Sequence, residues 1–249
     1  MTARRPLHEA AVPGAGEPAP AAQVPPFGFS RLLIVVTGSA SAVGLPQWLS
    51  WLRQEYPGLT VRVVMSRSAE RFVTPMSLGL RLQEDVEIDA WEECRRARHV
   101  EYAEWAEAVL VYPATFHFTA RLALGLADTP VLLALQCTDA LVALAPSLPP
   151  GGLDSPAFRS HWATLAARLN VVLVPPDQGY SLTTGREDGW VPPPLTEALR
   201  RLEDRRTERE RERERARRAV AGGPLAADEP AAHEWTTGHP AAPADGARA

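Results

Sequence analysis

The sequence predicts an α/β fold: a parallel β-sheet covered by helices on both faces, in a single domain with tails at both ends. Two observations lead to this prediction. The chain has 249 residues, of which 45% are hydrophobic, enough for one such domain with a filled core. Short apolar segments alternate with segments of helical spacing, which is typical of a parallel sheet with crossover helices.

Five segments are predicted strands, because near-continuous apolar runs are typical of strands buried on both faces. They are residues 31–38, 60–66, 106–113, 140–146 and 171–176. The helical spacing of the intervening segments predicts helices over 45–56, 99–108, 118–128 and 157–170. This order predicts a Rossmann-like (flavodoxin-like) arrangement, in which ligands bind beyond the carboxyl ends of the strands.

The regions outside the alternation differ from it in composition. Residues 1–29 are rich in Pro, Ala and Gly and are expected to be disordered, because they offer too little apolar area to offset chain entropy. A domain over 30–196 follows. Residues 197–220 alternate Glu and Arg at helical spacing, which predicts a charged helix, either a solvated helix or a docking arm. Residues 221–249 are expected to form a second disordered tail.

Composition also excludes several classes of function. No apolar run approaches the roughly 20 residues of a membrane span, and the start of the chain lacks the apolar core of a secretory signal, so a cytoplasmic location is expected. The net charge of −4 gives no reason to expect nucleic-acid binding. Cys94 and Cys137 belong to no close Cys/His cluster, so we expect free thiols and no metal site.

Small and hydroxyl-bearing residues follow several of the predicted strands. The segments are TGSASAVG (37–44), SRS (66–68), YPATFHF (112–118) and LAPSLPPGG (144–152). In a parallel sheet these turns lie along one edge, where glycine allows close backbone approach and hydroxyls and helix amides favour an anion. A phosphate site is one interpretation; turns of this kind also contain Gly and Ser for structural reasons alone.

From Arg31 to about Pro193 the chain resembles the flavin-containing cysteine decarboxylases, which include peptidyl-cysteine decarboxylases of lanthipeptide pathways and phosphopantothenoylcysteine decarboxylases. The similar segments, in order, are LLIVVTGSASA, VRVVMSRSAERFVTP, HVEYAEWAEAVLVYPAT and LALGLAD. In the third segment, a histidine stands fourteen residues before the proline, as it does in the family. The resemblance implies a Rossmann-like fold, bound FMN, and assembly as a homo-oligomer, a trimer or dodecamer.

The resemblance also assigns roles to individual residues. It implies that His99, at the head of the third segment, is the catalytic residue. The positions that it implies for contact with FMN are Gly38, Ser39, Ala40, Ser66, Ser68, Ala114, Thr115, Phe116, His117 and Ala145.

Three positions depart from the family's pattern. His117 stands where the family has an asparagine, and Pro149 stands where the family has the asparagine of a clamp that grips the substrate carboxylate. Thr184 replaces a cysteine that pantothenate-pathway enzymes use to reduce the enethiol product. The last departure argues against coenzyme A biosynthesis.

The function implied is oxidative decarboxylation of the C-terminal cysteine of a ribosomally made precursor peptide to an enethiol. FMN takes a hydride from Cβ, and the resulting thioaldehyde accepts the electrons as CO₂ leaves, while His99 accepts the thiol proton. Two alternatives stay open: a phosphopantothenoylcysteine decarboxylase, and a catalytically inactive flavin-binding subunit of a peptide-modifying complex.

Overall fold

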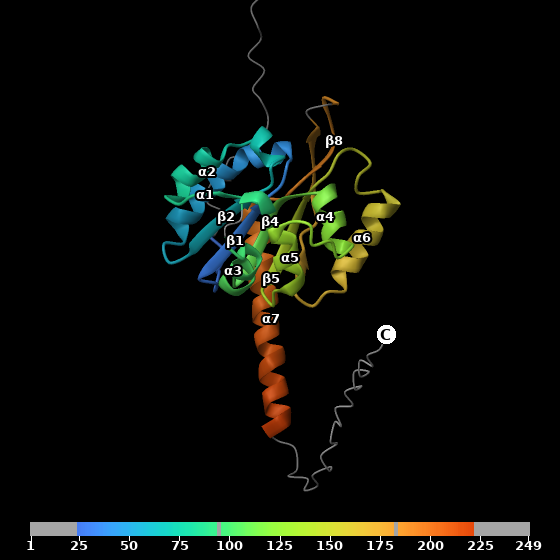
Figure 1. The fold of residues 1–249 in the computed structure, drawn as a ribbon. Helices are drawn as coiled ribbons and strands as arrows, with labels where there is room; N and C mark the ends of the chain where they lie inside the picture. Colours follow the sequence, from blue (N-terminus) through green and yellow to red (C-terminus); the bar gives the residue numbers. More distant parts are fainter. Residues whose placement is uncertain (1–23, 94–95, 182–183, 222–249) are drawn as a thin grey trace, which may run out of the picture. The chain divides into compact units, whose positions relative to one another are not determined.

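A computed structural model describes residues 24–93, 96–181 and 184–221. Its centre is a six-stranded parallel sheet in the order β3-β2-β1-β4-β5-β6, which confirms the predicted fold (Figure 1). The strands are β1 (Arg31–Val36), β2 (Thr60–Met65), β3 (Glu87–Ile88), β4 (Ala108–Thr115), β5 (Leu141–Ser147) and β6 (Val171–Leu173). None of the helices formed by the described residues has the length and apolarity needed to span a bilayer.

The direction in which strands are added reverses between β1 and β4. After β1 the chain moves outward through β2 to the edge strand β3, and then returns to place β4 on the other side of β1. Connections leaving the carboxyl ends of β1 and β4 therefore diverge to opposite sides and open a crevice between them. This switch point is where the fold favours a ligand.

The helices begin where sequence signals place them. They are α1 (Leu45–Glu55), α2 (Pro75–Leu82), α3 (Arg98–Trp105), α4 (Phe116–Ala123), α5 (Pro130–Cys137), α6 (Pro156–Ala166) and α7 (Leu195–Ala221), with short 3₁₀ turns η1 (Ala40–Gly44), η2 (Ala69–Arg71) and η3 (Trp91–Glu93). Thr74, Thr115, Thr129 and Ser155 each cap a helix by accepting a hydrogen bond from a backbone N–H three residues on. Helix α5 was not predicted, because its apolar residues lie all around it rather than on one stripe.

Two apolar layers cover the sheet. Alternate residues of β1 point to opposite faces, so that Leu32 and Ile34 join one layer while Leu33 and Val35 join the other. Helices α1, α2 and the start of α7 complete the first layer, and α3, α4, α5 and α6 complete the second. Burial on both faces explains why the strands read as continuous apolar runs.

Part of the expected N-terminal tail is packed on the domain. Of the segment 1–29, residues 24–29 are described: Phe27 and Phe29 pack against the core, and the Gly28 N–H donates to Glu203 of α7 at 2.8 Å. The remainder, 1–23, lies outside the described residues, as do residues 222–249 of the expected C-terminal tail.

The charged helix predicted at 197–220 is α7, but its first turns belong to the core. Leu195, Ala198, Leu199 and Leu202 are fully buried. Further along, arginine and glutamate pair at helical spacing, as between Arg206 and Glu210. The apolar residues thus anchor this end of α7 as part of the domain.

A β-hairpin that the sequence did not predict follows the sheet. Strands β7 (Asp177–Ser181) and β8 (Arg186–Val191) pair antiparallel, and they lie above the carboxyl ends of the sheet strands in Figure 1. Trp190 exchanges backbone hydrogen bonds of 2.9 and 3.0 Å with Leu148, directly after β5. The hairpin is therefore fixed beside the crevice, although its polar strands lack the apolar alternation that identifies a strand from sequence.

Candidate functional site

The carboxyl ends of β1 and β4 are joined by one hydroxyl group. Thr37 Oγ1 donates to the Pro113 carbonyl at 2.7 Å and accepts from the Thr115 N–H at 2.9 Å. Thr37 is buried and Thr115 is half-buried, so these bonds are shielded from water. They hold the two strand ends at a fixed separation at the switch point.

Three serine hydroxyls gather beside this link. Ser147, the last residue of β5, lies with its Oγ 2.7 Å from that of Ser39 and 3.1 Å from that of Ser41. All three side chains are half-buried, and Ser39 also caps the turn η1. The cluster draws on residues over a hundred positions apart in the chain, and it leaves neutral hydroxyl donors at the surface.

Gly38 allows the turn after β2 to approach the turn after β1. A Cβ atom at Gly38 would lie 2.5 Å from Ser68 Oγ and 2.9 Å from the Ser68 backbone carbonyl carbon. Ser66 and Ser68 in turn lie with their hydroxyls 3.0 Å apart. Only glycine permits this approach, because a backbone atom cannot move aside as a side chain can.

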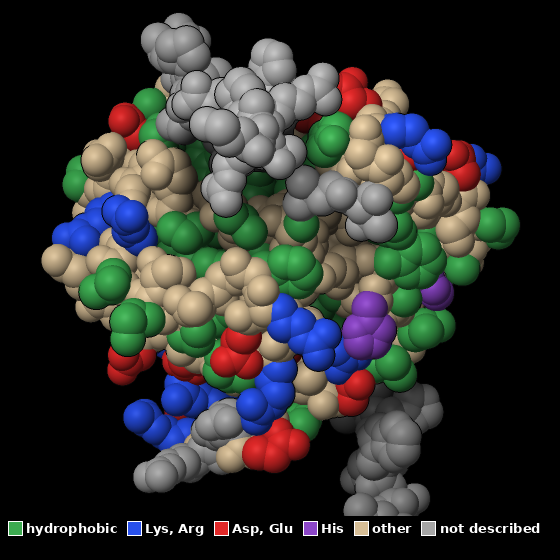
Figure 2. All heavy atoms as spheres, turned by 90° about the horizontal axis from the view of Figure 1, so that it is seen from above, with side chains coloured by type: hydrophobic (Ala, Val, Ile, Leu, Met, Phe, Trp, Pro, Cys, Tyr) green, Lys and Arg blue, Asp and Glu red, His purple; other side chains and the backbone are tan. Residues whose placement is uncertain are grey.

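These groups fit the phosphate end of a flavin mononucleotide. A phosphate monoester needs several hydrogen-bond donors and no nearby carboxylate, and the hydroxyls of Ser39, Ser41 and Ser147 supply the donors. Seen from above, this side of the molecule is mostly hydrophobic or uncharged near its centre, and a group of Arg and His side chains borders that central part (Figure 2). An apolar, uncharged face also suits a flat aromatic ring.

The remaining cofactor candidates differ in what they can offer. Ala114 and Ala145 are fully buried, backbone included, so neither presents surface to a ligand in this structure. Ala40 is exposed at the start of η1.

Tyr112 lies just before the end of β4 and has a structural role. The Tyr112–Pro113 peptide bond is cis, and the buried Tyr112 hydroxyl donates to the Pro193 carbonyl at 2.8 Å. Burial raises the pKa of Tyr112, so this phenol stays neutral and acts as a structural donor.

Phe116 and His117 open α4 directly beyond β4. The Phe116 ring lies 5.4 Å from that of Phe158 and 6.5 Å from that of His161, which brings an aromatic wall from α6 to the same edge. The hydrogen bond from Arg121 is the main cause that lowers the pKa of Asp128, and the exposed His117 makes a smaller contribution in the same direction. Phe116 and His117 thus lie directly beyond the carboxyl end of β4.

His99 lies near the start of α3, the helix that leads from the edge of the sheet to β4. Because α3 runs antiparallel to the strands it connects, its first residues lie toward the carboxyl edge. The His99 ring contacts that of Trp91 at 5.6 Å, and its Nδ1 is buried without a hydrogen-bond partner in the described part of the chain. The structure places His99 beside Trp91 and groups it with none of the serines.

Asp89 is a buried carboxylate that the sequence reasoning missed. It follows β3, and its Oδ1 accepts from the Val131 N–H at 2.9 Å, which satisfies an amide in the first turn of α5. Burial raises the pKa of Asp89, and the bond from Val131 opposes that rise. No motif identified it, because its partner lies 42 positions away.

Ser41, Ser147 and Thr37 were likewise absent from the predicted site. Each stands at or near the end of a predicted strand, so the strand pattern alone gave a usable signal.

Two of the residues that depart from the family pattern lie near the hairpin in sequence. Pro149 is exposed, and the Thr184 hydroxyl donates to Asp188 Oδ1 at 2.6 Å within the hairpin. That bond is the largest cause that lowers the pKa of Asp188.

Two hollows in the structure lie elsewhere. They have volumes of about 350 and 1010 Å³, and both are lined by residues around β3 at the sheet edge. Neither lining includes the serine cluster. The case for a cofactor site at the serine cluster therefore rests on the chemistry of its hydroxyls at the strand ends rather than on the size of a hollow.

Comparison with known proteins identifies the family of the chain. The model of the family described as "Flavoprotein" matches residues 28–189. The chain is 34% identical over 151 residues to the cypemycin cysteine dehydrogenase (decarboxylating) of a Streptomyces species, covering 60% of this chain and 78% of that protein. It is 30% identical over 125 residues to the coenzyme A biosynthesis bifunctional protein CoaBC of Bacillus subtilis, covering 49% of this chain and only 30% of that protein.

Solved structures give the same grouping. The crystal structure of the cypemycin decarboxylase CypD matches with a TM-score of 0.63 and 31% identity, over 74% of this chain and 98% of that one. The FMN-dependent cysteine decarboxylase SpaF matches with a TM-score of 0.56 and 25% identity, over 69% of this chain and 96% of that one. The chain therefore belongs to the flavoprotein family, and within it groups with the FMN-dependent cysteine decarboxylases.

Proposed function

We propose that this protein oxidatively decarboxylates the C-terminal cysteine of a ribosomally made precursor peptide, giving an enethiol, with FMN as its cofactor. The observation that carries the proposal is the cluster of Ser39, Ser41 and Ser147 at the switch point of a chain similar to the cypemycin decarboxylase. A flavin anchored there by its phosphate would have its ring along the same edge of the sheet as the aromatic wall.

The protein's own residues then have three tasks. Serine hydroxyls hold the phosphate, the Thr37–Thr115 link keeps the strand ends apart at a constant distance, and the apolar face excludes water. Bound FMN supplies the two-electron acceptor that oxidation of the cysteine side chain requires.

His99 is the proposed acceptor of the thiol proton. Its Nδ1 lacks a partner in the described part of the chain, and an imidazole can exchange a proton at neutral pH. Within one chain its ring neighbour is Trp91 rather than the serine cluster. We therefore propose that the protein is a homo-oligomer in which His99 of one copy serves the flavin of another, as the family resemblance implies.

The alternative enzyme, a phosphopantothenoylcysteine decarboxylase, has less support. Similarity to CoaBC covers under a third of that bifunctional protein. Thr184, where such enzymes carry a cysteine, is engaged with Asp188 in the hairpin. An inactive flavin-binding subunit is the other alternative, favoured by Pro149, whose side chain offers no hydrogen bond to a substrate carboxylate.

One experiment separates the three. Purified protein is examined for bound FMN by its visible spectrum, and is then incubated with peptides ending in Cys and, separately, with phosphopantothenoylcysteine. We expect the peptide to lose the mass of CO₂ and two hydrogens, as measured by mass spectrometry. Turnover of the small substrate alone would favour the alternative enzyme. Bound flavin without turnover of either would favour the inactive subunit, and a protein that binds no FMN would contradict all three.

A further inference from the structure

The edge strand β3 forms the floor of a groove between two helices. The larger hollow, of about 1010 Å³, is bounded by Pro75, Met76, Gly79 and Leu80 of α2, by residues 83–88, and by Arg98 and Tyr102 of α3. Met76 and Leu80 are 75% and 74% exposed at the rim, whereas Glu87 and Ile88 are half-buried. The strand is thus recessed below its two walls.

The two walls differ in chemistry. The α2 wall is apolar, and Val86 and Ile88 of the strand segment pack on the same side of the sheet. On the α3 side, Glu87 pairs with Arg98 at 2.5 Å and accepts a hydrogen bond from the Tyr102 hydroxyl. A segment lying along this groove would meet an apolar surface on one side and a polar one on the other.

The backbone of β3 presents one amide to a further strand. Asp89 donates its N–H to the Met65 carbonyl of β2, and amides of a strand alternate in direction, so the Ile88 N–H points to the open edge. The Ile88 carbonyl on that edge already accepts from the Ala90 N–H at 2.9 Å, and only its second lone pair is left for an added strand. Successive side chains of an added strand also alternate between faces. A strand paired to β3 would therefore place its apolar residues toward α2 and its polar residues toward α3.

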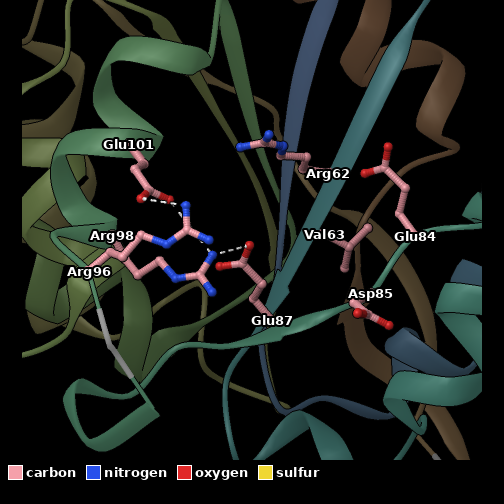
Figure 3. Close-up of a pocket in the computed structure, with 8 residues that line it drawn as sticks. All are labelled: Arg62, Val63, Glu84, Asp85, Glu87, Arg96, Arg98 and Glu101. Atoms are coloured by element: carbon pink, nitrogen blue, oxygen red, sulfur yellow. Dashed lines mark ion pairs between the residues drawn. The ribbon is translucent and has the colours of Figure 1, made fainter.

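A charged hollow of about 350 Å³ continues the groove at the amino end of β3. It shares Glu84, Asp85, Glu87 and Arg98 with the larger one. Four carboxylates face three guanidinium groups in its lining, which leaves one negative charge in excess. Figure 3 shows Arg96, Arg98 and Glu101 gathered with Glu87 on one side, while Glu84 and Asp85 lie apart from that ion-paired cluster.

We propose that this groove binds an extended segment of the peptide substrate as an added β-strand, an inference that rests on the peptide substrate proposed above. Main-chain bonds to β3 provide affinity, and alternating apolar and basic side chains provide selectivity. The excess negative charge favours basic residues. At its carboxyl end β3 leads to Asp89, Trp91 and His99, so a bound segment is directed toward His99, the proposed proton acceptor for the flavin of another copy.

The β3 strand of a second copy fits the groove less well. That strand would lie equally recessed between α2 and α3 of its own copy, so the two pairs of walls would meet before the strands could pair. A single extended peptide has no such walls. The shape of the groove therefore favours a flexible segment over a folded edge.

The test uses a peptide that cannot be a substrate. Fluorescein-labelled Arg-Val-Arg-Val-Arg-Val with a C-terminal amide has no cysteine and no free carboxylate, so its binding is independent of decarboxylation. Its affinity for the full chain is measured by fluorescence anisotropy. We expect the Leu80→Asp variant to bind it about tenfold more weakly, because an apolar contact at the rim is lost.

Leu169→Asp is the matched control, since Leu169 is 80% exposed and lies between α6 and β6, outside both hollows. It should bind the probe as the wild type does. A peptide of the same composition in blocks, Arg-Arg-Arg-Val-Val-Val, should bind more weakly, and hydrogen exchange at residues 86–90 should slow when the alternating probe is added. Absence of probe binding, equal binding by Leu80→Asp, or equal binding of the block peptide overturns the proposal.

The oligomeric state of the same variants tests whether the groove is instead a contact between copies of the chain. If sedimentation shows that Leu80→Asp dissociates an oligomeric wild type while Leu169→Asp does not, the groove is a contact between copies and the peptide proposal is wrong. If the probe binds as expected but no Cys-terminated peptide is decarboxylated, the groove stands as a peptide site and the proposed activity fails. The two results are thus distinguishable.

Discussion

Thr37 and Thr115 join the ends of β1 and β4 through a single hydroxyl, which donates to the Pro113 carbonyl and accepts from the Thr115 amide. The two residues are 78 positions apart in the chain. Their bond is formed at the point where the strand order reverses, so it couples the stability of the fold to the shape of the proposed flavin site.

Removing that hydroxyl should destabilise the domain. Thr37→Val keeps the shape of the side chain but leaves the Pro113 carbonyl and the Thr115 N–H without their partner, which costs about 1–3 kcal/mol. Thr37→Ser retains the hydroxyl and should lose much less. Urea denaturation followed by circular dichroism measures both; equal stability of the two variants would contradict the role given to the hydroxyl.

Gly38 and Gly44 provide a matched pair of substitutions. Gly38→Ala places a methyl group against the backbone of Ser68 and should lower the free energy of unfolding by about 1–3 kcal/mol, with loss of FMN binding as the turn moves. Gly44→Ala meets no atom within 4 Å and has a helical backbone, so it should be neutral or stabilising. Thermal melting and flavin absorbance report the two effects, and similar behaviour of both variants would refute the argument.

Ser147 tests the serine cluster. Ser147→Ala removes the hydroxyl that faces both Ser39 and Ser41, and should weaken FMN binding about tenfold through the loss of a phosphate contact. Riboflavin, which lacks the phosphate, should bind wild type and variant alike. Titration of the apoprotein by flavin fluorescence measures both ligands; an equal loss for riboflavin would place the phosphate elsewhere.

His99→Ala should separate cofactor binding from turnover. Because His99 lies beside Trp91 and not among the serines, the variant should retain FMN and lose about 10²–10⁴-fold in decarboxylation rate. Mixing it with a Ser147→Ala chain offers a further measurement if the oligomer exchanges subunits. Mixed oligomers would then regain turnover at FMN concentrations too low for Ser147→Ala alone, whereas a histidine acting within its own chain would give no recovery.

Asp89 should make stability depend on pH. Its pKa is raised in the folded chain, mainly by burial, so the folded state holds a proton more tightly than the unfolded state does. Stability from this group is therefore present at low pH and is lost as pH rises from the ordinary value of 3.8 through the raised one. Asn cannot ionise, so the stability of Asp89→Asn relative to the wild type should increase over that interval.

Urea denaturation at a series of pH values measures this difference. Below the ordinary value of 3.8 both forms are uncharged at position 89, and the difference in unfolding free energy should be constant. A relative stability of Asp89→Asn that falls as pH rises would show that the ionised carboxylate is stabilised by its bond from Val131 more than it is penalised by burial.

The strands show how far the sequence could predict this fold. Residues 32–36 of β1 are all apolar because both faces of the strand are covered. This pattern can be recognised in the sequence without knowing which strands pair with β1. Helix α5 and the β7–β8 hairpin were missed, since one is apolar all around and the other is polar. The two-residue strand β3 is too short to leave any pattern.

Some residues of the candidate site could likewise be found from the sequence, and others could not. Gly38 and Ser39 could be proposed from the sequence because they follow an identifiable strand, whereas Thr115 was proposed through the family resemblance. The strand pattern places Ser147 at a strand end, but it carries no record of the partners that Ser147 and Asp89 meet, which lie 108 and 42 positions away.

The sequence by itself determined the alternation of strands and helices, the strand ends where a ligand would bind, and the resemblance to flavin-containing cysteine decarboxylases. Local periodicity and turn residues suffice for these, because they reflect the burial of each element on its own. Only the tertiary structure decided which hydroxyls meet, that Thr37 bonds to the end of β4, and that β3 lies in a groove between α2 and α3. These features arise from strand order and packing, which bring distant residues into contact.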